Sequence, residues 1–288
     1  MPATRRLLVL CATTSIATLG GAGAALADPS GFISLGAGPL HAQFDFDPAT
    51  FSQSGYGARG LASGVIEVTP VLGIQGDVLL GLDHFESDFD EYDRSTMDVA
   101  LHGFYRDPER FLAGTFVQLG RDTVSHSFGD DTMDRVYFGG EAQVFVGDLT
   151  LYAQGGLQQF SFPDVPDFKQ NGWFGTLEAR YFLTPDLRIE AHAGLSKLSY
   201  DVGFDITATT MNLGIGAEYR LENLPVSLFA SLDCFNLTYQ PIGDFSMDHQ
   251  RFLVGVRFGI GEDTLKDRDR NGASLKPVDS VGVSISPR

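Results

Sequence analysis

The sequence predicts an all-β protein, a transmembrane antiparallel up-and-down β-barrel of about 12 strands (roughly 10–14). Three observations predict this fold. Long segments alternate between apolar and polar residues, short and longer connections follow one another in turn, and the N-terminus has the layout of a secretory signal. The 288 residues also include 34 Gly and 23 Phe, a composition that favours many strands over long surface helices.

The first 27 residues have the three-part layout of a cleaved signal peptide. Arg5 and Arg6 precede a charge-free stretch, and the small residues Ala25 and Ala27 stand at −3 and −1 of a cleavage site. An uncleaved membrane anchor is the alternative. It fits less well, because the stretch is rich in Gly, Thr and Ala and a good cleavage site follows it. We therefore expect an exported chain that begins at Asp28.

Twelve segments alternate with a period of two, which places apolar side chains on one face of a strand and polar ones on the other. In 211–220, for example, every odd position is apolar and every even position is polar or glycine. The segments cover 31–46, 57–69, 72–86, 95–107, 111–125, 133–147, 149–162, 172–184, 187–200, 209–221, 225–238 and 249–261. Ordinary strands have about five or six residues, whereas a tilted strand of roughly 9–11 residues crosses the hydrocarbon core of a bilayer. The segment lengths therefore favour membrane-spanning strands.

The connections between these segments are of two kinds. Short turns fall near 70, 107–110, 147–148, 184–186 and 222–224, and longer polar loops near 47–56, 87–94, 126–132, 163–171, 201–208 and 239–248. A secreted β-sandwich also has alternating strands, but it is not expected to sort its connections in this way. Lipid offers no hydrogen-bond partners to the backbone, so the sheet is expected to close into a barrel.

The signal peptide, the alternating strands and the final hairpin, which ends in 251–260, resemble the Gram-negative outer-membrane β-barrel proteins, in the broad porin-like group. The resemblance covers about 31–261 and concerns architecture, without a diagnostic motif. It implies a location in the cell outer membrane. The expected partners are outer-membrane lipids, lipopolysaccharide and the outer-membrane assembly machinery. The expected organisation is a signal peptide (1–27), the barrel (28–261) and a flexible periplasmic C-terminal tail (262–288).

The tail departs from the resemblance, because such barrels commonly end on their last strand. Asp267, Asp269, Asn271 and Gly272 match the start of a calcium loop. Val278 stands where that loop requires a bidentate Glu, so the tail is interpreted as a flexible segment and no metal site is expected.

The chain is acidic, with 20 Lys+Arg against 37 Asp+Glu and a formal charge of −17. This balance argues against nucleic acid as a partner, because phosphate binding needs a basic patch. The loop at 86–93 holds five acidic residues, and Asp130, Asp131 and Asp134 follow in the next loop. These residues suggest either divalent cations that bridge to lipopolysaccharide or a solvated, mutually repelling surface. The second interpretation is favoured.

If the apolar faces contact lipid, the polar faces surround the lumen, where charges face water or one another. Candidate lumen-lining residues close to the short turns form a mixed cluster at the expected periplasmic mouth: Glu178, Arg180, Arg188, Glu190, Glu218, Arg220 and Arg257. They are either the selectivity lining of a narrow pore or an ion-pair network that stiffens the barrel. The expected function is a porin-like passive channel for small hydrophilic solutes. The alternative is a closed structural or adhesin-like barrel without transport.

A membrane-embedded hydrolase is the least favoured function. Ser125, His126 and Ser127, near Asp130, are the local combination that suggests one, but they lie in a predicted loop tip and a catalytic triad needs an orienting scaffold. The sequence has no phosphate-binding glycine loop, metal-binding helix or dinucleotide motif. We therefore expect no enzyme activity, no catalytic residues and no cofactor.

Overall fold

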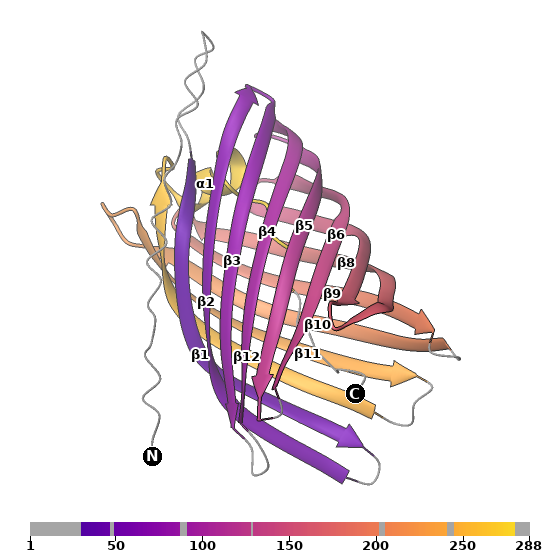
Figure 1. Ribbon diagram of the computed structural model, residues 1–288. Helices are drawn as coiled ribbons and strands as arrows, with labels where there is room; N and C mark the ends of the chain where they lie inside the picture. Colours follow the sequence, from indigo (N-terminus) through magenta and orange to yellow (C-terminus); the bar gives the residue numbers. More distant parts are fainter. Residues whose placement is uncertain are drawn as a thin grey trace.

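The computed structural model describes residues 30–46, 49–86, 91–127, 129–201, 205–240 and 245–279. Within these residues, twelve strands form one closed barrel (Figure 1). The strands are β1 (Ser30–Phe46), β2 (Ala49–Thr69), β3 (Leu72–Glu86), β4 (Glu91–Asp107), β5 (Phe111–His126), β6 (Gly129–Val146), β7 (Leu149–Phe162), β8 (Val165–Thr184), β9 (Leu187–Asp201), β10 (Asp205–Arg220), β11 (Val226–Gln240) and β12 (Phe245–Ile260). The predicted fold class is confirmed.

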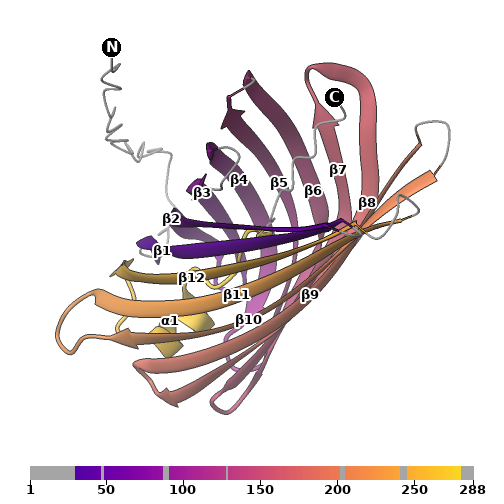
Figure 2. The same cartoon turned by 90° about the horizontal axis from the view of Figure 1, so that it is seen from below.

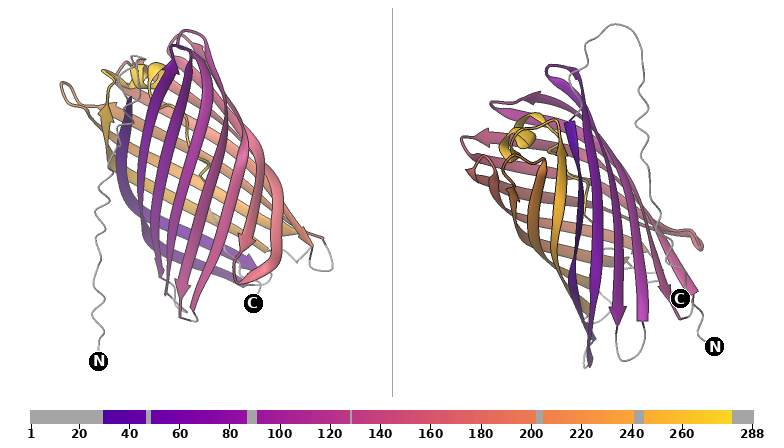
Figure 3. Two further views of the ribbon diagram at one scale, coloured as in Figure 1. Left: turned by 45° about the horizontal axis from the view of Figure 1, so that its top comes forward. Right: turned by 90° about the vertical axis from the view of Figure 1, so that its left-hand side faces the viewer.

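Each strand pairs antiparallel with its neighbours in sequence, and β1 pairs with β12 to close the sheet. The closing register runs from Gly31 opposite Ile260 to Phe46 opposite Phe245 and is interrupted at Gly38 and Pro39. The strands are strongly tilted against the barrel axis, as Figure 3 shows from two sides. The closed order leaves no strand of the barrel with an unpaired edge.

The sequence predicts the connections between strands correctly at one end of the barrel and incorrectly at the other. Strands are joined by short turns at 70–71, 108–110, 147–148, 185–186 and 221–225, as the sequence predicts. At the opposite end the prediction of longer loops is wrong, because at most four residues separate consecutive strands there. β2, for example, begins at Ala49, inside the predicted loop 47–56, and the Thr50 hydroxyl donates to the Asp45 carboxylate across the hairpin (2.8 Å). Backbone pairing does not require an apolar face, so the ladder continues beyond the amphipathic part of each strand.

The two faces of the sheet have opposite chemistry. On β4, Val99 and Leu101 are exposed outward, whereas Asp98 and His102 are buried in the interior. The same alternation exposes Leu177 (66%) and buries Glu178 (6%) on β8. Soluble proteins bury large apolar side chains and rarely expose contiguous apolar patches of this extent. An apolar outer surface around a polar interior is the arrangement expected of a barrel surrounded by lipid.

The C-terminal segment lies inside the barrel. After β12, the short helix α1 (Leu265–Asn271) lies within the mouth that carries the short turns, and 272–279 continue into the interior as an extended segment (Figure 2). Leu265, Ala273 and Leu275 are at most 3% exposed. No helix within the described ranges is long and apolar enough to cross a membrane.

This arrangement corrects the expectation of a flexible tail for residues 262–279. Ala273 and Leu275 pack in a cluster with Phe32, Phe104 and Tyr152 of the barrel wall. Farther along the lumen, a second cluster holds Val278. The tail looks polar along the chain, but the polar interior of a barrel accepts such a segment because its polar groups find partners there. Residues 280–288, like the expected signal peptide (1–27), lie outside the described residues.

We expect an outward-facing charge to be tolerated according to its height on the barrel. Leu119 lies in the middle of β5 and Val146 at the turn end of β6, and both are 59% exposed. Leu119→Arg should lower the free energy of unfolding in phospholipid vesicles by ~2–4 kcal/mol, and Val146→Arg by ~0–1 kcal/mol, because the cost of an arginine falls toward the interface. Urea unfolding followed by tryptophan fluorescence measures both. Equal costs at the two positions would contradict a lipid-facing belt.

Candidate functional site

Four inward-facing glutamines hold the backbone of the C-terminal segment. We call Gln75, Gln118, Gln143 and Gln154, which come from β3, β5, β6 and β7, the glutamine ladder. The Gln75 amide donates to the carbonyl of Leu275 (2.8 Å) and accepts from its N–H (3.2 Å).

Gln118 makes the same double contact with Val278, donating at 3.0 Å and accepting at 2.6 Å. Gln143 donates to the Ser274 carbonyl (3.1 Å), and Gln154 donates to the Lys276 carbonyl (3.0 Å). A side-chain amide that both donates to and accepts from one residue reproduces the pairing of two strands. The ladder therefore fixes the register of the tail without adding a strand to the sheet.

The end of α1 is held by an arginine of the wall. Arg106 on β4 donates to the carbonyls of Asn271 (2.6 Å) and Gly272 (2.7 Å). The last carbonyls of a helix lack intrahelical partners and carry partial negative charge, so a buried guanidinium satisfies them and neutralises the helix end. At the other end of α1, Thr264 caps the helix by accepting from the N–H of Asp267 (3.0 Å).

An exposed ion pair anchors α1 to the rim. Lys266 donates to the Asp148 carboxylate in the turn between β6 and β7 (2.8 Å), and its N–H donates to the carbonyl of Pro185 (3.0 Å). The hydrogen bond and charge of Lys266 hold the pKa of Asp148 below its ordinary value. Burial raises the pKa of the nearby Glu262 carboxyl. Because Asp148 is exposed, its pair with Lys266 orients the helix more than it stabilises the fold.

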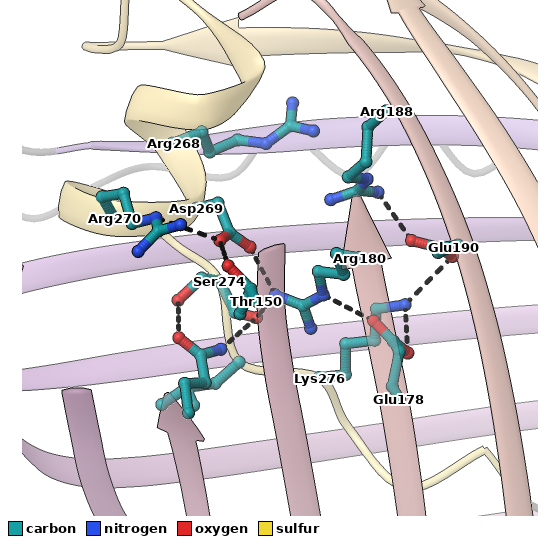
Figure 4. Close-up of polar contacts among 12 residues, drawn as sticks. Thr150, Glu178, Arg180, Arg188, Glu190, Arg268, Asp269, Arg270, Ser274 and Lys276 are labelled. Atoms are coloured by element: carbon teal, nitrogen blue, oxygen red, sulfur yellow. Dashed lines mark hydrogen bonds and ion pairs between the residues drawn. The ribbon is translucent and has the colours of Figure 1, made fainter. Parts of the chain in front are cut away.

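Inside the barrel four charged residues of the tail pair with charges of the wall: Arg268, Asp269, Lys276 and Asp279, the last with Arg251. Figure 4 shows the contacts of Asp269 and Lys276. Asp269 accepts from Arg180 (2.7 Å) and from the Thr150 hydroxyl. Lys276 lies between two carboxylates, 2.7 Å from Glu178 and 3.1 Å from Glu190.

Arg268, another of these tail residues, donates to Glu218 (2.7 Å). Each of these contacts of Arg268, Asp269 and Lys276 with the wall joins residues at least 50 positions apart in the sequence, so the contacts of the tail form only when it lies inside the barrel.

Six of the seven predicted lumen residues belong to this one network. Arg188 lies 2.9 Å from both Glu190 and Glu218, and Glu218 also accepts from Arg257. The predicted residues within the barrel are Glu178, Arg180, Arg188, Glu190, Glu218 and Arg257. Arg220 is placed differently, because it is half-buried at the rim and donates to the carbonyl of Glu262 (2.7 Å). A role of these residues in lining a pore stays a prediction.

Several interior charges were not among the candidates. Arg59 on β2 pairs with Asp83 on β3 (2.6 Å), and Arg251 on β12 pairs with Asp233 on β11 (3.3 Å). Arg251 has the same strand parity as the predicted Arg257, so the alternation alone would have placed it inside. The tail residues had no such signal, since their positions depend on a fold-back that no periodicity encodes.

A second buried network lies beside the glutamine ladder. His102 on β4 lies 2.8 Å from Asp77 and 2.7 Å from Glu141, and Tyr152 donates to Glu141 (2.8 Å). Gln75 of the ladder also donates to Asp77 (3.0 Å), so this network and the tail share a side chain. Together they fill the lumen along β3–β7.

The calcium-like motif of the tail is used for internal contacts. Asp269 is engaged by Arg180, and Asn271 donates to Asp267 (2.7 Å) within α1. Within the part of the chain that the structure describes, no group of three or more His, Cys, Asp or Glu side chains is arranged to hold a metal ion. Of the hydrolase-like combination, His126 ends β5 and lies 3.0 Å from Asp131.

Open space remains on the other side of the tail. A cavity of about 240 Å³ lies between 273–279 and the strands β7–β12, β1 and β2. A second cavity of about 70 Å³ shares Thr176, Asn212 and Asp279 with it and continues toward the aromatic cluster of Tyr137 and Phe174. The tail thus closes one side of the lumen and leaves a narrow space on the other, lined by both charged and apolar side chains.

Comparisons with known proteins show similarity in fold. No family model and no curated protein matches the sequence. An outer membrane channel from Pseudomonas putida is similar with a TM-score of 0.58 and 13% identity, over 80% of this chain and 94% of that chain. The translocator domain of the autotransporter NalP from Neisseria meningitidis is similar with a TM-score of 0.50 and 12% identity, over 79% and 88%. The chain therefore has the fold of outer-membrane β-barrel proteins, and identities this low carry no statement about activity.

We expect the ladder to control the order of the tail. Gln118→Leu keeps the side-chain size but leaves the N–H and carbonyl of Val278 without partners, at a cost of about 1–3 kcal/mol. Hydrogen exchange at the Val278 amide should accelerate by at least about tenfold. Gln159→Leu is the matched control, because Gln159 lies on the outer face of β7 and contacts Asn171. Unchanged protection of Val278 in Gln118→Leu would show that the ladder does not hold the tail.

Proposed function

We propose that the protein is an outer-membrane β-barrel that works as a narrow, porin-like channel for small hydrophilic solutes, with residues 262–279 as a built-in constriction. The single observation that supports this most is the pair of adjoining cavities beside the tail, the larger of which is lined by many charged side chains as well as apolar ones. Interior charge of this density is costly at membrane depth unless it faces water or a partner, and a hydrated passage supplies the water.

The size of the barrel fits a restricted passage. Eight strands make an interior that side chains just fill, and 16–18 strands leave a channel, so twelve strands enclose more space than side chains alone occupy. Here the tail takes up much of the excess. The apolar outer surface and the fold shared with solved outer-membrane barrels support a location in the outer membrane. The partners in this proposal are outer-membrane lipids, lipopolysaccharide and the assembly machinery.

A closed structural barrel is the second candidate function. One observation favours it, which is the number of specific contacts that hold the tail: ladder hydrogen bonds at four positions, the Arg106 clamp and five tail charges in ion pairs with the wall. A segment held this firmly also suits a permanent filling of the lumen. Conductance separates the two functions, because a permanently filled barrel passes no ions.

We expect the full chain in a planar lipid bilayer to show small unitary current steps. In the double variant Gln75→Leu, Gln118→Leu the tail loses its two bidentate contacts, and the unitary conductance should rise severalfold. Gln159→Leu should leave the conductance unchanged, and heat-modifiable gel migration checks that each variant folds. Absence of steps in both the parent chain and the double variant would reject the channel and favour the closed barrel.

A further inference from the structure

The larger cavity carries more positive than negative side chains. Seven cationic side chains and four acidic ones line it, an excess of three positive charges in a chain whose formal charge is −17. The cationic side chains are Arg59, Arg180, Arg188, Arg251, Arg257, Arg268 and Lys276, and the acidic ones are Glu178, Glu190, Asp233 and Asp279. The surface of the cavity therefore carries more cationic than acidic side chains, although the chain as a whole is acidic.

The excess arises from the position of the counter-ions. Glu218 accepts from three guanidinium groups, those of Arg188, Arg257 and Arg268, but does not itself line the cavity. Asp83 and Asp269, the partners of Arg59 and Arg180, are likewise outside the lining. With these three acids included, seven carboxylates pair with the seven cationic side chains, so the excess of positive groups is confined to the surface of the cavity. The arginines face the cavity, and their shared acids lie behind them.

Several of these arginines also keep unused donors. Among the described residues, Arg180 Nη2, Arg188 Nε and Arg251 Nε are buried and have no hydrogen-bond partner. The three side chains are only 1%, 9% and 4% exposed. A buried donor without a partner costs about 1–3 kcal/mol, and more when it is charged, so the acids around these guanidinium groups do not satisfy all of their donors. His192 and Asn212, which also line the cavity, add polar groups to it.

We propose that this cavity binds a small oxyanion, a carboxylate or a phosphate, and that it makes small anionic solutes the preferred substrates of the channel. This inference rests on the proposed function for its second half only, since binding does not require transport. Guanidinium groups match carboxylate and phosphate oxygens with paired hydrogen bonds. A volume of about 240 Å³ lies below the range of roughly 300–1,000 Å³ typical of drug-sized ligands, so the ligand is a single small molecule.

The tail is part of this site. Arg268 and Lys276 contribute two of the seven positive charges, and Ala273–Pro277 form one wall of the cavity. Lys276 is held at the cavity by Glu178 and Glu190, which lie on β8 and β9. The site is therefore complete only when the C-terminal segment occupies the lumen, and the constriction and the anion site are one structure.

Calorimetric titration of the full chain in detergent tests the binding, with inorganic phosphate and acetate as probes at low ionic strength, where screening is weak. We expect saturable binding that weakens by at least about tenfold in Arg188→Gln, Arg257→Gln. Lys276→Met should also weaken binding. This single variant tests the site if the double variant does not fold. Arg121→Gln is the control, because Arg121 is an exposed residue paired with Asp134. Absence of binding, or equal affinity in the parent chain, the double variant and Lys276→Met, overturns the site.

The reversal potential across a salt gradient tests the selectivity separately. We expect a preference for chloride over potassium in the parent chain, and a loss of this preference in Lys276→Met. If current flows but neither anion preference nor phosphate binding is observed, the anion site is refuted and the channel stands. Phosphate binding without current refutes the channel but leaves the site.

Discussion

The structure depends on one constraint, that every backbone polar group must have a partner when the outer surface is apolar. A sheet with an apolar outer face gains stability in lipid, but any open edge would present unpaired N–H and carbonyl groups there. Pairing of β1 with β12, from Gly31 to Phe46 with an interruption at Gly38 and Pro39, closes that edge. The same constraint acts on the tail inside the barrel, where no neighbouring strand is free to pair with it. The glutamine ladder supplies the missing partners from side chains.

Closure creates an interior that must then be filled. A barrel of twelve strands encloses too much space for its own side chains, and an empty polar lumen would leave charged groups with water alone. In this protein the chain returns into its own barrel and divides the lumen. Along β3–β7 the ladder holds the tail, and the network around His102 shares Gln75 with it. Along β7–β12, β1 and β2 the tail borders a cavity whose lining has more cationic than acidic side chains.

The ion pairs of the lumen have two structural consequences. They connect the tail to the wall through Arg268, Asp269 and Lys276, so that the orientation of α1 and the position of the extended segment are set together. They also distribute charge unevenly, because Glu218 is shared by three arginines. Buried ion pairs often contribute little net stability, since desolvation offsets the attraction. In this protein the ion pairs contribute more to the placement of charge and to a single position of the tail than to net stability.

Much of the barrel follows from local patterns in the sequence. Alternation with period two identifies twelve strands and the face of each, because side-chain direction in a strand depends only on parity. Parity alone therefore predicts an interior position for Glu178, Arg180, Arg188, Glu190, Glu218 and Arg257. It fails for the strand extensions at the loop end, such as the first residues of β2, because backbone pairing there continues without an apolar face.

The tertiary structure alone decided the course of the tail and the division of the lumen. Residues 262–279 have no periodicity that distinguishes a flexible tail from a segment bound inside the barrel. Their order comes from partners such as Gln75 and Gln118, which lie 200 and 160 residues away in the sequence. The sequence by itself determined the wall, since each strand carries its own amphipathic pattern. The position of the tail in the lumen depended on the tertiary structure. The side chains that hold the tail come from distant strands, and they lie close together only in the closed barrel.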